Sequence, residues 1–171
     1  MGCDIHIYAE VKENGEWEKV GPVFDDPYYA PERPLSDWNQ PKIDQPYVGR
    51  NYDLFAILAD VRNGRGFAGV PTGTGFVPIA APRGLPNDVT PGVEAQADSW
   101  GRDGHSHSWL LLSELQGYDW DQVTTHVSYY TSVQWESTYR DSVGEHFFKT
   151  ITALQALGHP DSVRIVFWFD N

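Results

Sequence analysis

The sequence predicts one α+β domain spanning residues 1–171, with an N-terminal β-hairpin, a small mixed or antiparallel sheet, two main helices and a long Gly/Pro-rich loop region. Three observations carry this prediction. Residues 3–11 alternate apolar and polar side chains, the pattern of a half-buried strand. Residues 143–157 repeat apolar side chains at helical spacing. Residues 163–169 are apolar on nearly both faces, as in a central strand.

The first predicted strand runs toward Asn14-Gly15, the strongest short-range hairpin signal, and residues 17–20 would form the returning strand. Residues 21–49 hold six prolines and several aromatic residues, which predicts a long ordered loop rather than a linker. Its aromatic side chains are expected to pack against the domain: Phe24, Tyr28, Tyr29, Trp38 and Tyr47.

A helix is predicted over residues 50–62, with Asn51 as N-cap and Asn63-Gly64 as its end. Residues 64–107 are expected to be mostly loop, and a loop of this length is usually functional. A short buried strand over 109–112 and a short helix from Ser113 should follow, while the state of 123–133 stays open. Gly158 and Pro160 would end the last helix before the central strand.

The composition limits the classes of partner. The chain has 12 basic and 24 acidic residues, a formal net charge of −12, so a nucleic-acid partner is not expected. One cysteine rules out an internal disulfide and suits a reducing compartment. The sequence contains neither an apolar run of membrane-spanning length nor the features of a signal peptide, so we expect a cytoplasmic protein without a membrane partner.

Two polar motifs suggest a metal site. Asp4 and His6 share the polar side of the first strand, and Asp103, His105 and His107 occur in a Ser-His turn far along the chain. Carboxylate and imidazole ligands suit a divalent transition metal such as zinc or manganese, which activates water for hydrolysis. Glu10 is a further candidate ligand. The alternative is a solvent-facing strand and a turn whose side chains cap nearby backbone.

The same motifs resemble those of the metallophosphoesterase superfamily, whose first metal motif is Asp-x-His and whose last is Gly-His-x-His. In that superfamily a crossover helix follows the first motif, whereas an Asn-Gly hairpin follows it here. The intervening Gly-Asp-x-x-Asp and Gly-Asn-His-Asp/Glu motifs do not occur in this chain. We therefore interpret the likeness as shared chemistry rather than membership.

Other residues are candidates for binding a small molecule. Arg83 lies in Pro82-Arg83-Gly84-Leu85-Pro86, where the prolines would hold its guanidinium rigidly for a phosphate or carboxylate. Residues 69–75 are Gly-rich and could cradle a phosphate, although the P-loop context is missing. His126, His146 and His159 are isolated in the sequence and are expected to be structural or exposed. The full set of ligand-binding candidates is Arg50, Asn51, Tyr52, Asp53, Arg83 and Trp109.

Four segments together resemble a family of small, uncharacterised proteins encoded by tailed phages and prophages. They are residues 1–6, residues 50–63, residues 82–86 and residues 103–109. The resemblance spans most of the chain. It implies a phage accessory protein that acts in the cytoplasm of the infected cell, and it brings no known fold, activity or catalytic residue.

Three functions remain open. The first is binding of a phosphorylated or nucleotide-like small molecule, for example to sequester a host defence signal. The second is a metal-dependent hydrolase that uses the Asp/His motifs. The third is an inhibitor that binds a host protein, and a homo-oligomer is compatible with all three. We favour binding because the chain contains no complete catalytic motif, so whether it is an enzyme stays open.

Overall fold

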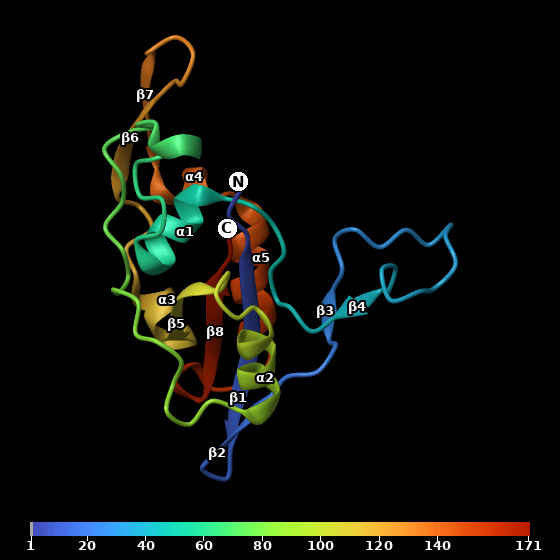
Figure 1. Ribbon diagram of the computed structural model, residues 1–171. Coiled ribbons are helices and arrows are strands. Elements are labelled where there is room, and N and C mark those ends of the chain that lie inside the picture. The colour runs from blue at the N-terminus through green and yellow to red at the C-terminus, as the bar shows by residue number, and fades with distance from the viewer. Residues whose placement is uncertain (1) are drawn as a thin grey trace.

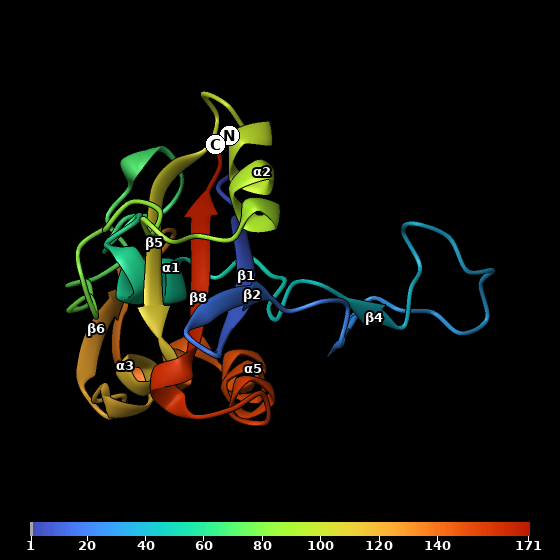
Figure 2. The ribbon, with the colours of Figure 1, turned by 90° about the horizontal axis from the view of Figure 1, so that it is seen from below.

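The computed structural model describes residues 2–171 and confirms the α+β prediction. A four-stranded sheet has the order β2-β1-β8-β5, and every neighbouring pair is antiparallel. Helices cover both of its faces (Figure 1), and the two chain ends lie side by side at one end of the sheet (Figure 2). The strands are β1 (Ile5–Glu13), β2 (Glu16–Lys19), β5 (His105–Leu111) and β8 (Val163–Phe169).

The N-terminal hairpin forms as predicted. Asn14 and Gly15 connect β1 to β2 with φ angles of 50° and 88°. Two consecutive positive φ values are what a type I′ turn requires, and this turn matches the twist of the flanking strands. The register then pairs Glu13 with Glu16 and Glu10 with Lys19.

The central position of β8 is also confirmed. All seven of its residues are buried, and it pairs with β1 on one side and β5 on the other. Phe167 and Phe169 belong to the larger core, whereas Val166 and Trp168 pack beneath α2 (Pro91–Ser99). The larger core is shared with α1 (Tyr52–Ala59), α3 (Leu112–Gly117), α4 (Tyr139–Val143) and α5 (Glu145–Gln155).

The boundaries of α1 show how polar side chains start and stop a helix. The Asn51 side chain accepts a hydrogen bond from the Leu54 N–H at 3.0 Å, as expected of an N-cap. The helix ends earlier than predicted, because Asp60 adopts the left-handed conformation at φ 59° and its N–H returns to the Ala56 carbonyl.

The expectation that residues 64–107 are mostly loop needs a correction at two places. Helix α2 lies within this range. The pattern that could have predicted it is Pro91 at its start, followed by buried Val93 and Ala97 four residues apart. Strand β5 begins at His105 rather than at Trp109, so the histidine motif lies on a strand. A short 3₁₀ turn, Phe67–Gly69, also falls here.

Residues 21–49, called the arm below, project from the body around the short strands β3 (Phe24–Asp25) and β4 (Lys42–Ile43) (Figure 2). Phe24 and Tyr47 are buried as expected. The expectation fails for Tyr28 and Trp38, whose side chains are 72% and 93% exposed. The outer part of the arm extends away from the domain, so Trp38 has no core to join, whereas Tyr28 lines an open pocket at the body of the domain.

The segment left open by the sequence forms a second hairpin, β6 (Val123–Val127) with β7 (Gln134–Thr138), which protrudes at the edge of the molecule (Figure 1). The last predicted helix is in fact two helices. Val143 ends α4, and Phe147, Ile151 and Leu154 are buried on α5. A 3₁₀ turn, Pro160–Ser162, leads into β8. Within residues 2–171, no helix is both long and apolar enough to cross a membrane.

Candidate functional site

Polar and aromatic residues gather at the two ends of α2, on the face of the sheet that this helix covers. The first group, called the histidine end below, lies beside the last turn of α2 and consists of Asp4, His6, Arg50, Trp100, His107, Trp168 and Asp170. The second group, called the tryptophan groove, lies beside the first turn of α2. Its principal residues are Lys12, Trp17, Arg83, Asp88, Trp109 and Arg164.

The fold brings the two predicted histidine motifs to the same end of the sheet. His6 on β1 lies opposite Trp168 on β8, and their ring centroids are 5.9 Å apart. His107 on β5 stacks on the same indole at 5.8 Å. Because β8 runs between β1 and β5, the indole of Trp168 separates the two imidazoles.

His105 and His107 contact different faces of the sheet. A register shift lies between His105 and Ser108, and Ser106 takes a φ of 52° there. His105 packs against Phe169, which belongs to the larger core, whereas His107 packs against Trp168 under α2. The Nδ1 atom of His105 lies 3.0 Å from Ser106 Oγ, and its buried Nε2 has no partner among residues 2–171.

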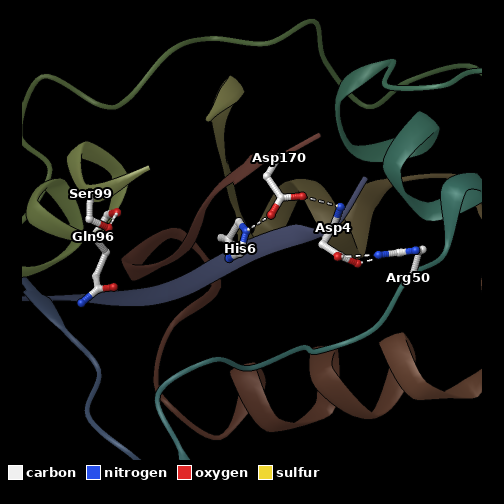
Figure 3. Close-up of polar contacts among 6 residues, drawn as sticks. All are labelled: Asp4, His6, Arg50, Gln96, Ser99 and Asp170. Atoms are coloured by element: carbon white, nitrogen blue, oxygen red, sulfur yellow. Dashed lines mark hydrogen bonds and ion pairs between the residues drawn. The ribbon is translucent and has the colours of Figure 1, made fainter. Parts of the chain in front are cut away.

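The carboxylates of the histidine end are occupied by local partners (Figure 3). Arg50 donates from Nε and Nη2 to the two oxygens of Asp4, at 2.8 and 2.6 Å. These hydrogen bonds hold the pKa of Asp4 below its usual range. Asp170 accepts the Asp4 N–H at 2.9 Å through Oδ1, and its Oδ2 lies 3.1 Å from His6 Nε2.

These contacts bear on the predicted metal ligands. Within the part of the chain that the structure describes, no three His, Cys, Asp or Glu side chains are grouped so that they could hold one ion. Asp103 lies exposed in the turn after α2, and Glu10 is buried at the opposite end of β1. The metal site and its zinc or manganese ion therefore stay a prediction.

The four ligand-binding candidates at the start of α1, residues 50–53, contact different parts of the molecule. Besides capping α1, Asn51 donates from Nδ2 to the carbonyls of Ser142 and Val143 at 3.1 and 3.0 Å. The Tyr52 hydroxyl accepts from the Cys3 N–H at 3.4 Å. Burial raises the pKa of Asp53, and a nearby charge on His126 opposes this shift. Of the four predicted residues, Arg50 is the one that reaches the histidine end.

His126 has a structural role, as expected. Its Nε2 atom lies 2.8 Å from Ser137 Oγ and 3.1 Å from Ser142 Oγ, and its ring stacks on Trp135 at 5.1 Å. The imidazole therefore links β6, β7 and α4. Sequence spacing could not reveal this link, because the state of residues 123–133 was ambiguous.

Arg83 and Trp109 do meet, in the tryptophan groove. The guanidinium of Arg83 lies over the Trp109 ring at 4.8 Å and donates to the Trp109 carbonyl at 3.1 Å. Its two terminal nitrogens also donate to the carboxylate of Glu114, at 2.9 and 2.5 Å. Arg83 is thus held by Glu114 and Trp109, and a carboxylate of the protein already occupies its fork.

Trp17 and Lys12 from the N-terminal hairpin complete the groove. Arg164 lies over the Trp17 ring at 3.9 Å, and the Lys12 ammonium lies over the same ring at 5.5 Å. The groove has a volume of about 790 Å³, within the usual range of small-molecule sites. Two indole rings and three cationic side chains, which lie over those rings, therefore line one open groove.

A buried ion pair that sequence analysis missed supports the groove from below. Glu10 is fully buried, and its carboxylate accepts from Arg164 Nε at 2.6 Å and from the Thr90 N–H at 2.8 Å. Arg164 also donates to a side-chain oxygen of Asp88 at 2.7 Å. Glu10 thereby satisfies a free N–H at the start of α2 and fixes this helix to the sheet. The sequence feature that could have predicted this ion pair is an arginine within the apolar run of β8.

The Gly-rich loop over residues 69–75 is engaged within the fold. The Thr72 and Thr74 N–H groups donate to the carbonyls of Gly64 and Thr125, both at 2.8 Å. A Cβ on Gly73 would lie 2.2 Å from the Thr125 carbonyl oxygen, so close approach to β6 requires a glycine there. These N–H groups are therefore bonded within the protein and do not face a phosphate.

No family model, curated protein or solved structure matches this chain. The phage-family resemblance therefore stays a proposal.

Proposed function

We propose that this protein binds a nucleotide-like small molecule in the tryptophan groove. The observation that carries the proposal is the meeting of Arg83 and Trp109, both singled out from the sequence, with Trp17 and Lys12 in one groove of about 790 Å³. Aromatic faces stack on flat heterocycles, and cations beside them attract an anionic group.

The charge of the groove limits the ligand to one with few phosphates. Arg83 and Arg164 are paired with Glu114, Glu10 and Asp88, so they offer little uncompensated charge. Lys12 forms no ion pair among residues 2–171 and is the cation open to a ligand. Since the chain carries a net charge of −12, a singly charged cyclic mononucleotide fits better than a triphosphate.

Calorimetric titration with cyclic mononucleotides, nucleoside monophosphates and ADP-ribose tests the proposal. We expect at least one of these compounds to bind and to quench tryptophan fluorescence. Trp109→Ala should weaken binding about ten-fold or more, because stacking of one base contributes about 1–3 kcal/mol. Lys12→Met should weaken binding mainly at low salt, where an exposed charge contributes most.

Trp135→Ala is the matched control, since this indole is also partly exposed but lies on β7, outside the groove. It should bind the compound with unchanged affinity. The proposal is rejected if none of the three classes binds at millimolar concentration, or if Trp109→Ala and Lys12→Met bind as tightly as the wild type.

The biological setting follows from the family resemblance. We propose that the protein is a phage accessory protein in the cytoplasm of an infected cell, where occupying a small signalling molecule would blunt a host defence. The acidic surface disfavours nucleic acid as a competing partner. Expression in the host during infection, followed by measurement of the free and bound signal, tests this part separately.

One observation keeps the metal-dependent hydrolase as a second candidate. His105 Nε2 is buried without a partner among residues 2–171, and an unsatisfied nitrogen of this kind can bind an ion. Metal analysis of the purified protein decides between the two candidates.

A further inference from the structure

The loop of the arm between β3 and β4 displays a tryptophan. Trp38 is 93% exposed and Leu35, three residues before it, is 66% exposed. Both belong to the arm, which projects away from the main sheet (Figure 2). A large exposed aromatic side chain on a protruding turn is typical of the anchor residue of a protein interface.

A buried asparagine holds this turn in place. Asn39 is 6% exposed, and its Oδ1 accepts the Ala30 N–H at 2.9 Å. Its Nδ2 donates to the carbonyls of Ala30, Arg33 and Pro34 at 3.1, 3.1 and 3.0 Å. The backbone of Asn39 also exchanges two hydrogen bonds with Ser36. Because the turn is ordered before it binds, Trp38 can dock at a small cost in conformational entropy.

A pocket lies at the other end of the arm, in the angle between its base and α5. It has a volume of about 450 Å³, enough for one indole side chain. Its apolar walls come from both elements: Phe24, Pro27, Pro46 and Ala153. Lys149 and His146 lie at the same pocket, both on exposed positions of α5.

The charges of these two regions are complementary. The turn carries Glu32, Arg33 and Asp37, a net charge of −1, and Asp37 directly precedes Trp38. Asp25 also lines the pocket, but its carboxylate is paired with Lys42 at 2.6 Å. The ammonium of Lys149, for which no ion pair occurs among residues 2–171, is therefore an uncompensated charge at the pocket. An indole entering the pocket would therefore bring a carboxylate toward a lysine.

We propose that the arm pairs two copies of this chain, with each Trp38 in the pocket at the base of the other copy's arm. Two arms placed side by side in opposite directions bring the β3–β4 loop of each against the other's base. One two-fold axis then makes the same contact twice, which is the usual form of a self-complementary dimer interface. This inference is independent of the proposed ligand, because the tryptophan groove takes no part in the contact.

Sedimentation equilibrium over a wide range of protein concentration tests the dimer. The wild type should associate reversibly to a dimer. Trp38→Ala should raise the dissociation constant about thirty-fold or more, the effect of removing an anchor tryptophan. Ala153→Trp, which fills the pocket from α5, should do the same. Both positions are exposed, so circular dichroism should show unchanged thermal unfolding.

The matched control is Tyr130→Ala, because Tyr130 is 90% exposed but lies at the tip of the β6–β7 hairpin. It should dimerise like the wild type. A mixture of Trp38→Ala with Ala153→Trp should form a heterodimer, since one intact contact remains between the tryptophan of the second variant and the open pocket of the first. A monomeric wild type at all concentrations, or a dimer that neither variant weakens, overturns the proposal.

Discussion

The histidine end and the tryptophan groove each contain an arginine that binds a carboxylate on β1 or just before it. The two ion pairs differ in how deeply they are buried. At the groove, the side chains of Arg164 and Glu10 are 3% and 0% exposed. At the histidine end, those of Arg50 and Asp4 are 51% and 46% exposed. The buried pair is a fixed part of the fold, whereas water can replace the exposed pair. A ligand can therefore exchange with Asp4 far more readily than with Glu10.

Breaking the buried pair should give the largest effect. Arg164→Met removes the partner of Glu10 and leaves a carboxylate without compensation in the core, so the free energy of unfolding should fall by about 3–5 kcal/mol. Urea denaturation followed by circular dichroism measures this change. The double variant Glu10→Gln with Arg164→Met should be more stable than Arg164→Met alone, because no uncompensated charge then remains. A single variant as stable as the wild type would contradict this assignment.

The histidine end should respond to pH through His107. Burial, reinforced by the charge of His105, lowers the pKa of His107 from its ordinary value of 6.5, while Asp98 opposes the shift. The unfolded chain then binds a proton that the folded chain does not, so this contribution to stability is present above pH 6.5 and is lost below it. His107→Phe keeps a ring against Trp168 and should flatten the acid dependence of the melting temperature.

His159→Phe is the control for this measurement, since His159 is exposed at the turn before β8. Its melting temperature should follow the wild-type curve. An acid dependence that is identical in the wild type and in His107→Phe would show that other groups cause it.

The sequence predicts those elements whose determinants are local. Asn14-Gly15 specifies the first hairpin, Asn51 specifies the start of α1, and seven buried residues specify β8. Helix α2 escaped prediction because its apolar side is short, with Val93 and Ala97 as its buried residues. Its position depends on Glu10 and on Trp168 beneath it, which are contacts that no local pattern encodes.

The same distinction applies to the candidate site. Arg83 and Trp109 could be named because prolines flank the first and the histidine motif precedes the second. Their pairing with Trp17 depends on the order of the strands, which the sequence does not reveal. The histidine motifs reach the same end of the sheet, yet Trp168 lies between them. The sequence predicted that β8 is a central strand but did not reveal that β1 and β5 are its neighbours.

Breaking the exposed pair should have a much smaller effect than breaking the buried one. Arg50→Met removes a guanidinium that water already reaches, so the urea midpoint should stay close to that of the wild type. The pKa of Asp4 should rise toward its ordinary value, because Arg50 is the main cause that lowers it. A carboxyl titration by NMR measures this rise. A loss of stability equal to that of Arg164→Met would show that the exposed and the buried ion pair contribute equally to stability, which contradicts the comparison.

Removing metal should have the smallest effect. We expect purified protein to hold less than one equivalent of zinc or manganese and EDTA to leave the melting temperature unchanged. Both oxygens of Asp4 accept from Arg50, and His6 and His107 lie on opposite sides of the Trp168 indole, about 9–10 Å apart across two strand spacings. Bringing them onto one ion would require the central strand to move. One equivalent of metal that is lost in His105→Ala, but kept in His159→Ala, would show that His105 holds an ion and would favour the hydrolase over the binding protein.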